Sequence, residues 1–220
     1  MPKIGKKLKS QLTKVGILVL VLLIADQAIK LYIKSNFLPW EYHNVIGEWF
    51  KIRYTENQGM AFGTALGKSV WHKLFLSIFR LVAIVLIAYY MYREAKKGAT
   101  LEFLIAVGLI FTGATGNLID SMFHDFIYPF NPCHQYSWMD GSGVFDRCSD
   151  YPMDIEVRHH GFMLGSVVDM FQFDFTWPNW VPWLGGNEIF PAIWNLADAC
   201  ISIGVGMILL RQKKYFPKKN

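Results

Sequence analysis

The stretch of sequence that decides the fold is residues 190–210, FPAIWNLADACISIGVGMILL. A membrane-spanning helix needs about 20 predominantly apolar residues, and this stretch has that length and character. It also carries a carboxylate, Asp198, about a third of the way along. A charge inside a span costs roughly 2.5 to 3.5 kcal/mol on insertion scales, so Asp198 is a candidate functional residue by default.

The rest of the chain has the same apolar character. Of its 220 residues, 53% are hydrophobic, which is too many for an ordinary soluble domain. Three more windows are long enough to span, at about 12–33, 74–92 and 101–121. The first follows a basic run, as in a signal peptide, but no small-residue cleavage site follows it, so we expect a retained span. We predict an all-α membrane protein with four transmembrane helices, forming one polytopic domain over residues 1–220.

Basic residues near the ends of spans indicate which side of the membrane each end faces. They gather before the first span, between the second and third, and after the fourth: Lys3, Lys6, Lys7, Lys9, Lys14, Arg93, Lys96, Lys97, Arg211, Lys213, Lys214, Lys218 and Lys219. We therefore expect both termini in the cytoplasm. Segment 122–189 has only Arg147 and Arg158 as bases among many acids, so it is expected outside, as is segment 34–73. The sequence has no stripe of basic residues interleaved with aromatic residues, so it does not indicate nucleic-acid binding.

Two features distinguish the expected extracytoplasmic segments. EWFKIRYTEN, residues 48–57, alternates apolar and polar residues and predicts a strand in a small β-element. FTWPNWVPWLGG, in the second segment, contains Trp177, Trp180 and Trp183. This composition suits the lipid headgroup interface, either as ordinary membrane anchoring or as a contact surface for a lipid-bearing substrate.

Polar residues converge toward the outer half of the membrane. Asp26 and Lys30 lie in the outer half of the first span at i and i+4, where they can pair, and we expect that pair to be structural. Each of GNLID and NLAD places an Asn three residues before an Asp, and the two pairs are Asn117 with Asp120 and Asn195 with Asp198. We expect both stretches to be helical, so that each pair shares one helix face.

A further acid, Asp169, lies in the apolar stretch GFMLGSVVDMFQF, which we expect to be a loop outside the membrane. Two acids brought close together can share a proton, one serving as base and the other as acid. This is the chemistry of an aspartic protease, and it needs no metal or organic cofactor. The same carboxylates could instead form the proton relay of an ion-coupled transporter, and the residues alone leave both readings open.

The sequence resembles the type II signal peptidases of bacteria, also called lipoprotein signal peptidases. The resemblance rests on five motifs in order along most of the chain: DQAIK, with Asp26 and Lys30; NQGMAFG, with Asn57, Gly59, Ala61, Phe62 and Gly63; GATGNLID, with Gly113, Gly116, Asn117 and Asp120; GSVVDMF, with Asp169; and FPAIWNLADACI, with Asn195, Ala197 and Asp198. The resemblance implies an aspartic endopeptidase of the inner membrane that cleaves prolipoproteins before a diacylglyceryl-modified cysteine.

The resemblance also implies roles for these residues. Asp169 and Asp198 would be the catalytic dyad, held with the substrate by Asn117 and Asn195. Asn57 would reach in from the extracytoplasmic strand, and four further residues would support the site: Asp26, Lys30, Gly116 and Asp120. The expected partners are diacylglyceryl-modified prolipoproteins and membrane lipid, with the enzyme itself a monomer.

Two departures from the family pattern stand out. The family usually has an Arg directly after the Asp of GNxxD, and here that position is Ser121. Residues 122–160 form an insertion between Asp120 and Asp169 that could be a lid, a partner surface or a tolerated loop. Cys133 and Cys148 lie in it, where a disulfide is an open alternative. With His124 and His134 nearby a metal site is conceivable, but their spacing matches no established zinc pattern, and we predict none.

Overall fold

The computed structural model describes residues 2–58, 69–128, 131, 133, 142–149 and 153–216, including the side chains from residue 5 onward. The contacts divide the chain into two compact units. Unit 1 consists of Met1–Ala28, Ile78–Leu118 and Leu196–Asn220, and unit 2 consists of Ile29–Ser77 and Ile119–Asn195. The prediction of a single functional domain stays a prediction.

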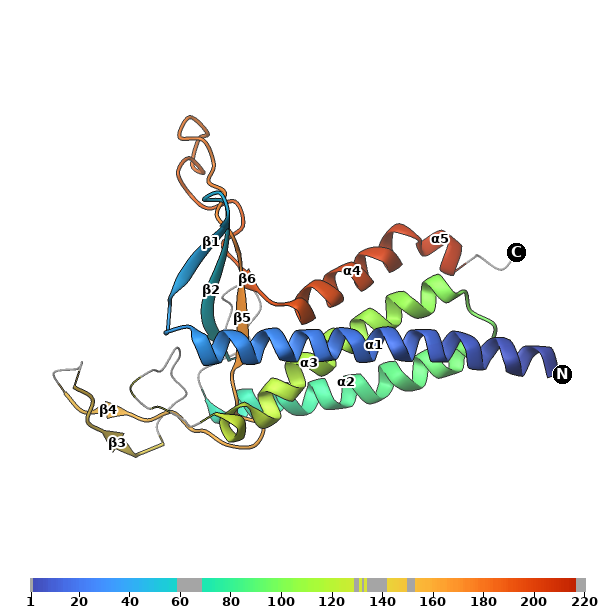
Figure 1. Cartoon of the computed structure of the whole chain (residues 1–220), viewed down its shortest axis with the longest axis horizontal. Helices are drawn as coiled ribbons and strands as arrows, with labels where there is room; N and C mark the ends of the chain where they lie inside the picture. The colour runs from blue at the N-terminus through green and yellow to red at the C-terminus, as the bar shows by residue number, and fades with distance from the viewer. Residues whose placement is uncertain are drawn as a thin grey trace. The chain divides into compact units, whose positions relative to one another are not determined.

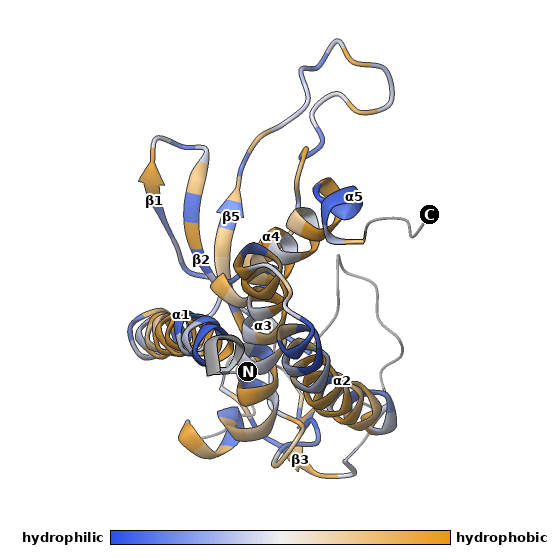
Figure 2. Ribbon diagram, turned by 90° about the vertical axis from the view of Figure 1, so that its right-hand side faces the viewer, coloured by the Kyte–Doolittle hydropathy of each residue, from blue (hydrophilic) through white to orange (hydrophobic). Residues whose placement is uncertain are grey.

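Three long helices are apolar enough to cross a membrane, as three of the four sequence windows predict. They are α1 (Pro2–Asn36), α2 (Val70–Lys96) and α3 (Leu101–Ile127), drawn in Figure 1. Each extends beyond its predicted window because polar helix-forming residues continue the helix past the apolar stretch. Large apolar side chains on α1 and α2 are exposed, among them Leu20, Ile24 and Val85. Figure 2 shows hydrophobic residues along both helices. Such apolar exposure fits helices that contact lipid.

The fourth predicted span differs from the expectation for residues 190–210. Its helix, α4, is Leu196–Leu210, only 15 residues, followed by the short helix α5 (Gln212–Tyr215). Ile193–Trp194 form strand β6 instead. Pro191 has no N–H to donate in a helix and biases its neighbour toward extended structure, which favours this late start. Asn195 therefore precedes the helix, and the prediction that Asn195 and Asp198 share a helix face is wrong.

Unit 2 contains a four-stranded antiparallel sheet with the order β1, β2, β5, β6 (Figure 1). Its first three strands are β1 (Tyr42–Ile46), β2 (Phe50–Asn57) and β5 (Val167–Phe173). Strand β2 confirms the strand predicted over residues 48–57. Asp169, which we expected in a loop, lies in β5 opposite Thr55 of β2. The run VVDMFQF has apolar residues at both odd and even positions, so its sequence lacks the clean alternation that marks a half-exposed strand.

The sheet packs through a small apolar core. Ile33, Tyr54, Val168 and Met170 form a buried cluster, with the last two on either side of Asp169 in β5. Because successive side chains of a strand point to opposite faces, Asp169 points away from the face that carries Val168 and Met170. In unit 1 a separate buried cluster joins Val15, Ala95 and Leu104.

The insertion is folded in the parts that the structure describes. Strands β3 (Phe145–Asp146) and β4 (Ile155–Glu156) pair antiparallel. Cys133 and Cys148 form a disulfide with their Cα atoms 5.6 Å apart. The open question of their pairing is thus answered, because both sulfurs lie within bonding geometry.

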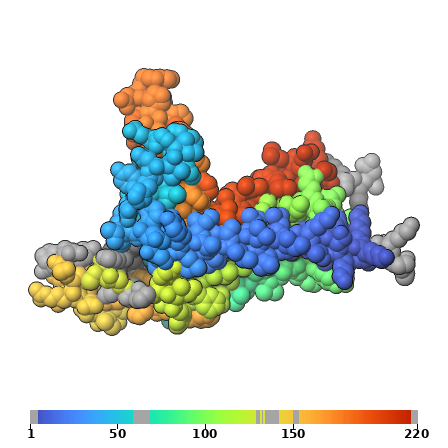
Figure 3. All heavy atoms as spheres, viewed as in Figure 1, coloured from blue at the N-terminus to red at the C-terminus, as the bar shows by residue number. Residues whose placement is uncertain are grey.

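The segment between β5 and β6 contains the tryptophan-rich stretch. In Figure 3 this segment, coloured orange, extends past the β1–β2 hairpin in light blue. Its backbone is held by internal hydrogen bonds between residues 177 and 187, including Trp177 N–H to Asn187 O and Gly186 N–H to Trp177 O, both 2.9 Å. Trp180 and Trp183 are 81% and 96% exposed, so this fold presents large aromatic side chains outward.

Candidate active site

Asp169 is buried on β5, and two side-chain amides donate hydrogen bonds to its carboxylate. Asn195 Nδ2 donates to Oδ1 at 2.6 Å, and Asn57 Nδ2 donates to Oδ2 at 3.1 Å. Asn195 also donates to the carbonyl oxygen of Val168 at 3.2 Å. The sheet brings these residues together, because Asn57 ends β2 opposite Val167 and Asn195 directly follows β6. Amide donors on both oxygens fix the orientation of the carboxylate.

Asp120 and Lys30 form a buried ion pair in the same unit. Lys30 Nζ lies 2.7 Å from Asp120 Oδ2, and both side chains are less than 5% exposed. The same oxygen of Asp120 accepts the N–H of Val168 at 3.3 Å. Asp120 thus binds the strand residue next to Asp169, an arrangement that suits a positioning acid.

In unit 1, Asp198 lies in the first turn of α4 and is hydrogen bonded to α3. Asn117 Nδ2 donates to Asp198 Oδ1 at 2.8 Å. Asp26 Oδ1 accepts the N–H of Ala197, the second residue of α4, at 3.0 Å. The first N–H groups of a helix have no partner within the helix, and the Asp26 carboxylate accepts a hydrogen bond from one of them. A carboxylate at this position also interacts favourably with the positive end of the helix dipole.

Gly116 lies where no side chain fits. A Cβ atom there would come within 2.7 Å of Asp26 Oδ2 and 3.2 Å of Ala197 Cβ. Gln27 Nε2 donates to both Asp26 Oδ2 at 3.1 Å and the carbonyl oxygen of Gly116 at 3.3 Å. Close packing of α1, α3 and α4 around Asp26 therefore depends on a glycine at this position, as is common where membrane helices approach closely.

All nine predicted site residues lie in polar clusters of the described chain. In unit 2 the clusters join Asp169 with Asn57 and Asn195, and Lys30 with Asp120. In unit 1 they join Asp198 with Asn117, and Asp26 with Gly116 through Gln27. The motif residues Gly59, Ala61, Phe62 and Gly63 lie outside the described residues.

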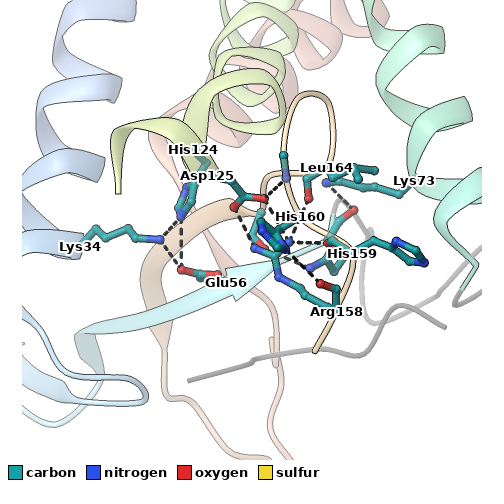
Figure 4. Close-up of polar contacts among 12 residues, drawn as sticks. Lys34, Glu56, Lys73, His124, Asp125, Arg158, His159, His160 and Leu164 are labelled. Carbon is teal, nitrogen blue, oxygen red and sulfur yellow. Dashed lines mark hydrogen bonds and ion pairs between the residues drawn. The ribbon is translucent and has the colours of Figure 1, made fainter. Parts of the chain in front are cut away.

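Sequence reasoning missed a further polar cluster in unit 2, which includes Glu56 (Figure 4). Glu56 Oε1 lies 2.7 Å from Lys34 Nζ, 3.3 Å from His124 Nε2 and 2.7 Å from the donating Tyr54 hydroxyl. Burial alone would raise the pKa of Glu56, but hydrogen bonds and charge from His124 and Lys34 outweigh it and hold the pKa well below its usual value. Helical spacing could have indicated this cluster, because Lys34 and His124 follow Lys30 and Asp120 by four residues.

A buried ion pair joins the end of α3 to the insertion. The guanidinium of Arg158 donates to both oxygens of Asp125, Nη2 to Oδ1 at 2.8 Å and Nη1 to Oδ2 at 3.2 Å. Both side chains are less than 5% exposed. Within the described ranges, no group of three or more His, Cys, Asp or Glu side chains could hold a metal ion.

The apolar helices of membrane length, together with their buried polar clusters, define the class of multi-pass membrane proteins. Comparison with known families makes this specific. The sequence model of the family described as signal peptidase (SPase) II matches residues 18–213, and the chain belongs to that family.

Individual relatives agree with this assignment. The lipoprotein signal peptidase of Porphyromonas gingivalis is 36% identical over 202 residues, covering 89% of this chain and 81% of that protein. The lipoprotein signal peptidase of Amoebophilus asiaticus is 32% identical, over 88% of this chain and 75% of that protein.

Two solved structures described as a bacterial membrane enzyme share the fold. One has a TM-score of 0.57 and covers 94% of this chain and 93% of its own. The other has a TM-score of 0.59, covering 92% and 94% respectively. Both are 21% identical in sequence to this chain.

Proposed function

We propose that this chain removes the signal peptide from prolipoproteins, cleaving before a diacylglyceryl-modified cysteine, with Asp169 and Asp198 as the two catalytic carboxylates. Membership of the signal peptidase II family supports the activity. The observation that carries the choice of residues is the hydrogen bond from Asn195 to Asp169, because Asn195 stands only three residues before Asp198 in the chain.

Chain connectivity supports this pairing of acids. Three residues extend at most about 11 Å, so the backbone of Asp198 cannot lie farther than that from the backbone of Asn195. Asn195 itself binds Asp169 directly. The NLAD motif therefore carries one of the two proposed acids and the amide that binds the other.

The proposed reaction uses the two acids in complementary protonation states. The charged carboxylate takes a proton from a water molecule while the water oxygen bonds to the carbonyl carbon of the scissile peptide. The protonated carboxylate donates a hydrogen bond to the carbonyl oxygen. When the carbon–nitrogen bond breaks, the protonated carboxylate gives its proton to the leaving nitrogen, which becomes the amino group of the lipid-modified cysteine, and the other carboxylate keeps the proton taken from water.

The neighbouring residues have supporting roles in this proposal. Asn57 and Asn195 orient Asp169, and Asn117 orients Asp198. Asp26 stabilises the start of α4, where Asp198 lies, and Gly116 leaves room for it. Lys30 neutralises Asp120, which holds the N–H of Val168.

We further propose four crossings of the inner membrane, with both termini in the cytoplasm and the site toward the outside. The fourth crossing is α4, which is about 22 Å long at 1.5 Å per residue, against a hydrocarbon core of about 30 Å. The basic residues at the span ends support this orientation. The disulfide between Cys133 and Cys148 is consistent with an oxidising compartment around segment 122–189.

The partners in this proposal are diacylglyceryl prolipoproteins and the lipid of the outer leaflet, with the enzyme acting as a monomer. The exposed rings of Trp180 and Trp183 support a lipid contact, because tryptophan favours the headgroup region of a bilayer.

The proposal is tested by cleavage of a diacylglyceryl prolipoprotein with purified protein. Asp169→Asn and Asp198→Asn should each abolish cleavage while the protein remains inserted and stable. Asp174→Asn, an acid one residue beyond β5 that pairs with Lys51, is the matched control and should cleave normally. Wild-type cleavage should not change with a chelator.

Two results would contradict the proposal. Normal cleavage by Asp169→Asn or Asp198→Asn would show that the replaced residue is not a catalytic carboxylate. Ion-coupled uptake into sealed vesicles, without cleavage of the prolipoprotein, would favour the transporter alternative instead.

A further inference from the structure

We propose that Arg158, contributed by the insertion, is a positioning residue for Asp169 that acts by fastening residues 158–168, the return segment, onto the end of α3. This inference rests on the proposed function of Asp169. It assigns a role to the insertion, which the family motifs leave without one.

The anchor of the return segment is the buried ion pair between Arg158 and Asp125. The guanidinium donates to both carboxylate oxygens, at 2.8 and 3.2 Å, and the side chains are 4% and 2% exposed. A bidentate pair of this kind fixes direction as well as distance. Figure 4 shows the two side chains facing each other beside the loop that carries His159, His160 and Leu164.

Arg158 and Asp125 also organise the turn that follows. Asp125 Oδ2 accepts the N–H of Gly161 at 2.9 Å. Arg158 Nη1 donates to the carbonyl oxygens of His159 at 2.9 Å and Leu164 at 3.5 Å. The ion pair is thus the centre of a small network that sets the path of residues 158–164.

From this turn the return segment follows the last turns of α3 toward Asp169. Gly165 N–H donates to the carbonyl oxygen of Ser121 at 3.0 Å, and Val168 N–H donates to Asp120 Oδ2 at 3.3 Å. A Cβ at Gly165 would come within 2.6 Å of the carbonyl oxygen of Asp120, so the two backbones are in close contact. Asp169 comes directly after these contacts.

Asp169 is therefore held from two directions. Strand β2 holds it from one side, through Asn57 and the register with Thr55. The contacts with Ser121 and Asp120 hold it from the other, and the Arg158 pair fixes the start of that segment. A shift of about 1 Å in a catalytic group can lower a rate by roughly a hundredfold, so loosening this anchor should affect catalysis.

The test compares kcat, KM and the thermal unfolding temperature of full-length variants on a diacylglyceryl prolipoprotein. Arg158→Gln should lower kcat roughly ten- to a hundredfold, with little change in KM. Arg158→Lys keeps the charge but loses the bidentate geometry, so its kcat should lie between that of the wild type and that of Arg158→Gln. Arg147→Gln is the matched control, since Arg147 forms an exposed pair with Asp154 in the same insertion, and it should behave as wild type.

The double variant Asp125→Asn/Arg158→Gln separates positioning from stability. Replacing only Arg158 or only Asp125 removes one charge of the buried ion pair and keeps the other, whereas the double variant removes both charges. We expect the double variant to recover unfolding temperature but not kcat. Recovery of kcat along with the unfolding temperature would overturn the positioning role, as would wild-type kcat in Arg158→Gln. If Arg158→Gln does not fold, a wild-type kcat in Arg158→Lys overturns it equally.

Asp169→Asn distinguishes failure of this inference from failure of the proposed function. If Asp169→Asn is inactive while Arg158→Gln cleaves as wild type, only the positioning role fails. If Asp169→Asn itself cleaves normally, the proposed function fails.

Discussion

Asn195 donates its side-chain amide to Asp169 at 2.6 Å, so the last residue before α4 binds an acid in the middle of β5. The two residues are 26 positions apart in the sequence. Asn195 is completely buried and Asp169 nearly so. This contact joins the asparagine of the NLAD motif to the acid of the GSVVDMF motif within unit 2.

Asn195→Ala should reduce cleavage strongly and lower stability. The change removes the donor to Asp169 Oδ1 and to the carbonyl oxygen of Val168, and leaving a buried hydrogen-bonding group without its donor costs about 1 to 3 kcal/mol. Thermal unfolding and prolipoprotein cleavage measure the two effects. Asn187→Ala, which removes an exposed bond to the carbonyl oxygen of Trp183, is the control and should change neither. Full activity in Asn195→Ala would contradict a role in orienting Asp169.

Gly116→Ala should destabilise the protein by about 1 to 3 kcal/mol, because the added methyl group would overlap Asp26 Oδ2. Gly206→Ala is the matched control on α4, where nothing lies within 4 Å of the added atom. Alanine favours helix over glycine by up to about 1 kcal/mol, so this control should be neutral or slightly stabilising. Equal unfolding temperatures for the two variants would show that the space around Gly116 is not restrictive.

Glu56 should make stability depend on pH in the acid range. Its pKa in the folded protein is held below the usual value by His124 and Lys34. A group with a depressed folded pKa stabilises the protein above its unfolded pKa, about 4.3 for Glu, and loses that contribution as pH falls toward the folded value. The unfolding temperature of wild type should therefore exceed that of Glu56→Gln at neutral pH.

The difference between these two proteins should shrink as the pH falls below about 4.3. Glu48→Gln, at an exposed position just before β2, is the control and should track the wild type at every pH. A difference between wild type and Glu56→Gln that stays constant down to acid pH would contradict the coupling.

The disulfide gives a direct test of topology. In spheroplasts, a membrane-impermeant maleimide should label Cys133 and Cys148 only after an external reductant breaks their bond. Cys200, buried in α4, should stay unlabelled, and the Cys133→Ser/Cys148→Ser variant is the control for background. Labelling that requires permeabilised membranes would reverse the proposed orientation.

The sequence by itself determined the elements that have a local pattern. Apolar windows predicted α1, α2 and α3, since a run of about 20 apolar residues is a property of consecutive residues. Alternation over residues 48–57 predicted β2 for the same reason. Family motifs singled out eight polar residues and Gly116 as site residues, and their catalytic and supporting roles stay predictions.

The tertiary structure decided what those patterns leave undetermined. Asp169 lies in a strand because β5 pairs with β2, more than a hundred residues earlier, and its own apolar run is compatible with either strand or loop. The start of α4 depends on the pairing of β6 with β5 and on Pro191. Arg158 forms an ion pair with Asp125 because the insertion folds back onto the end of α3. Partners of buried charges are set by the path of the chain in space, and hydropathy and helical period carry no information about that path.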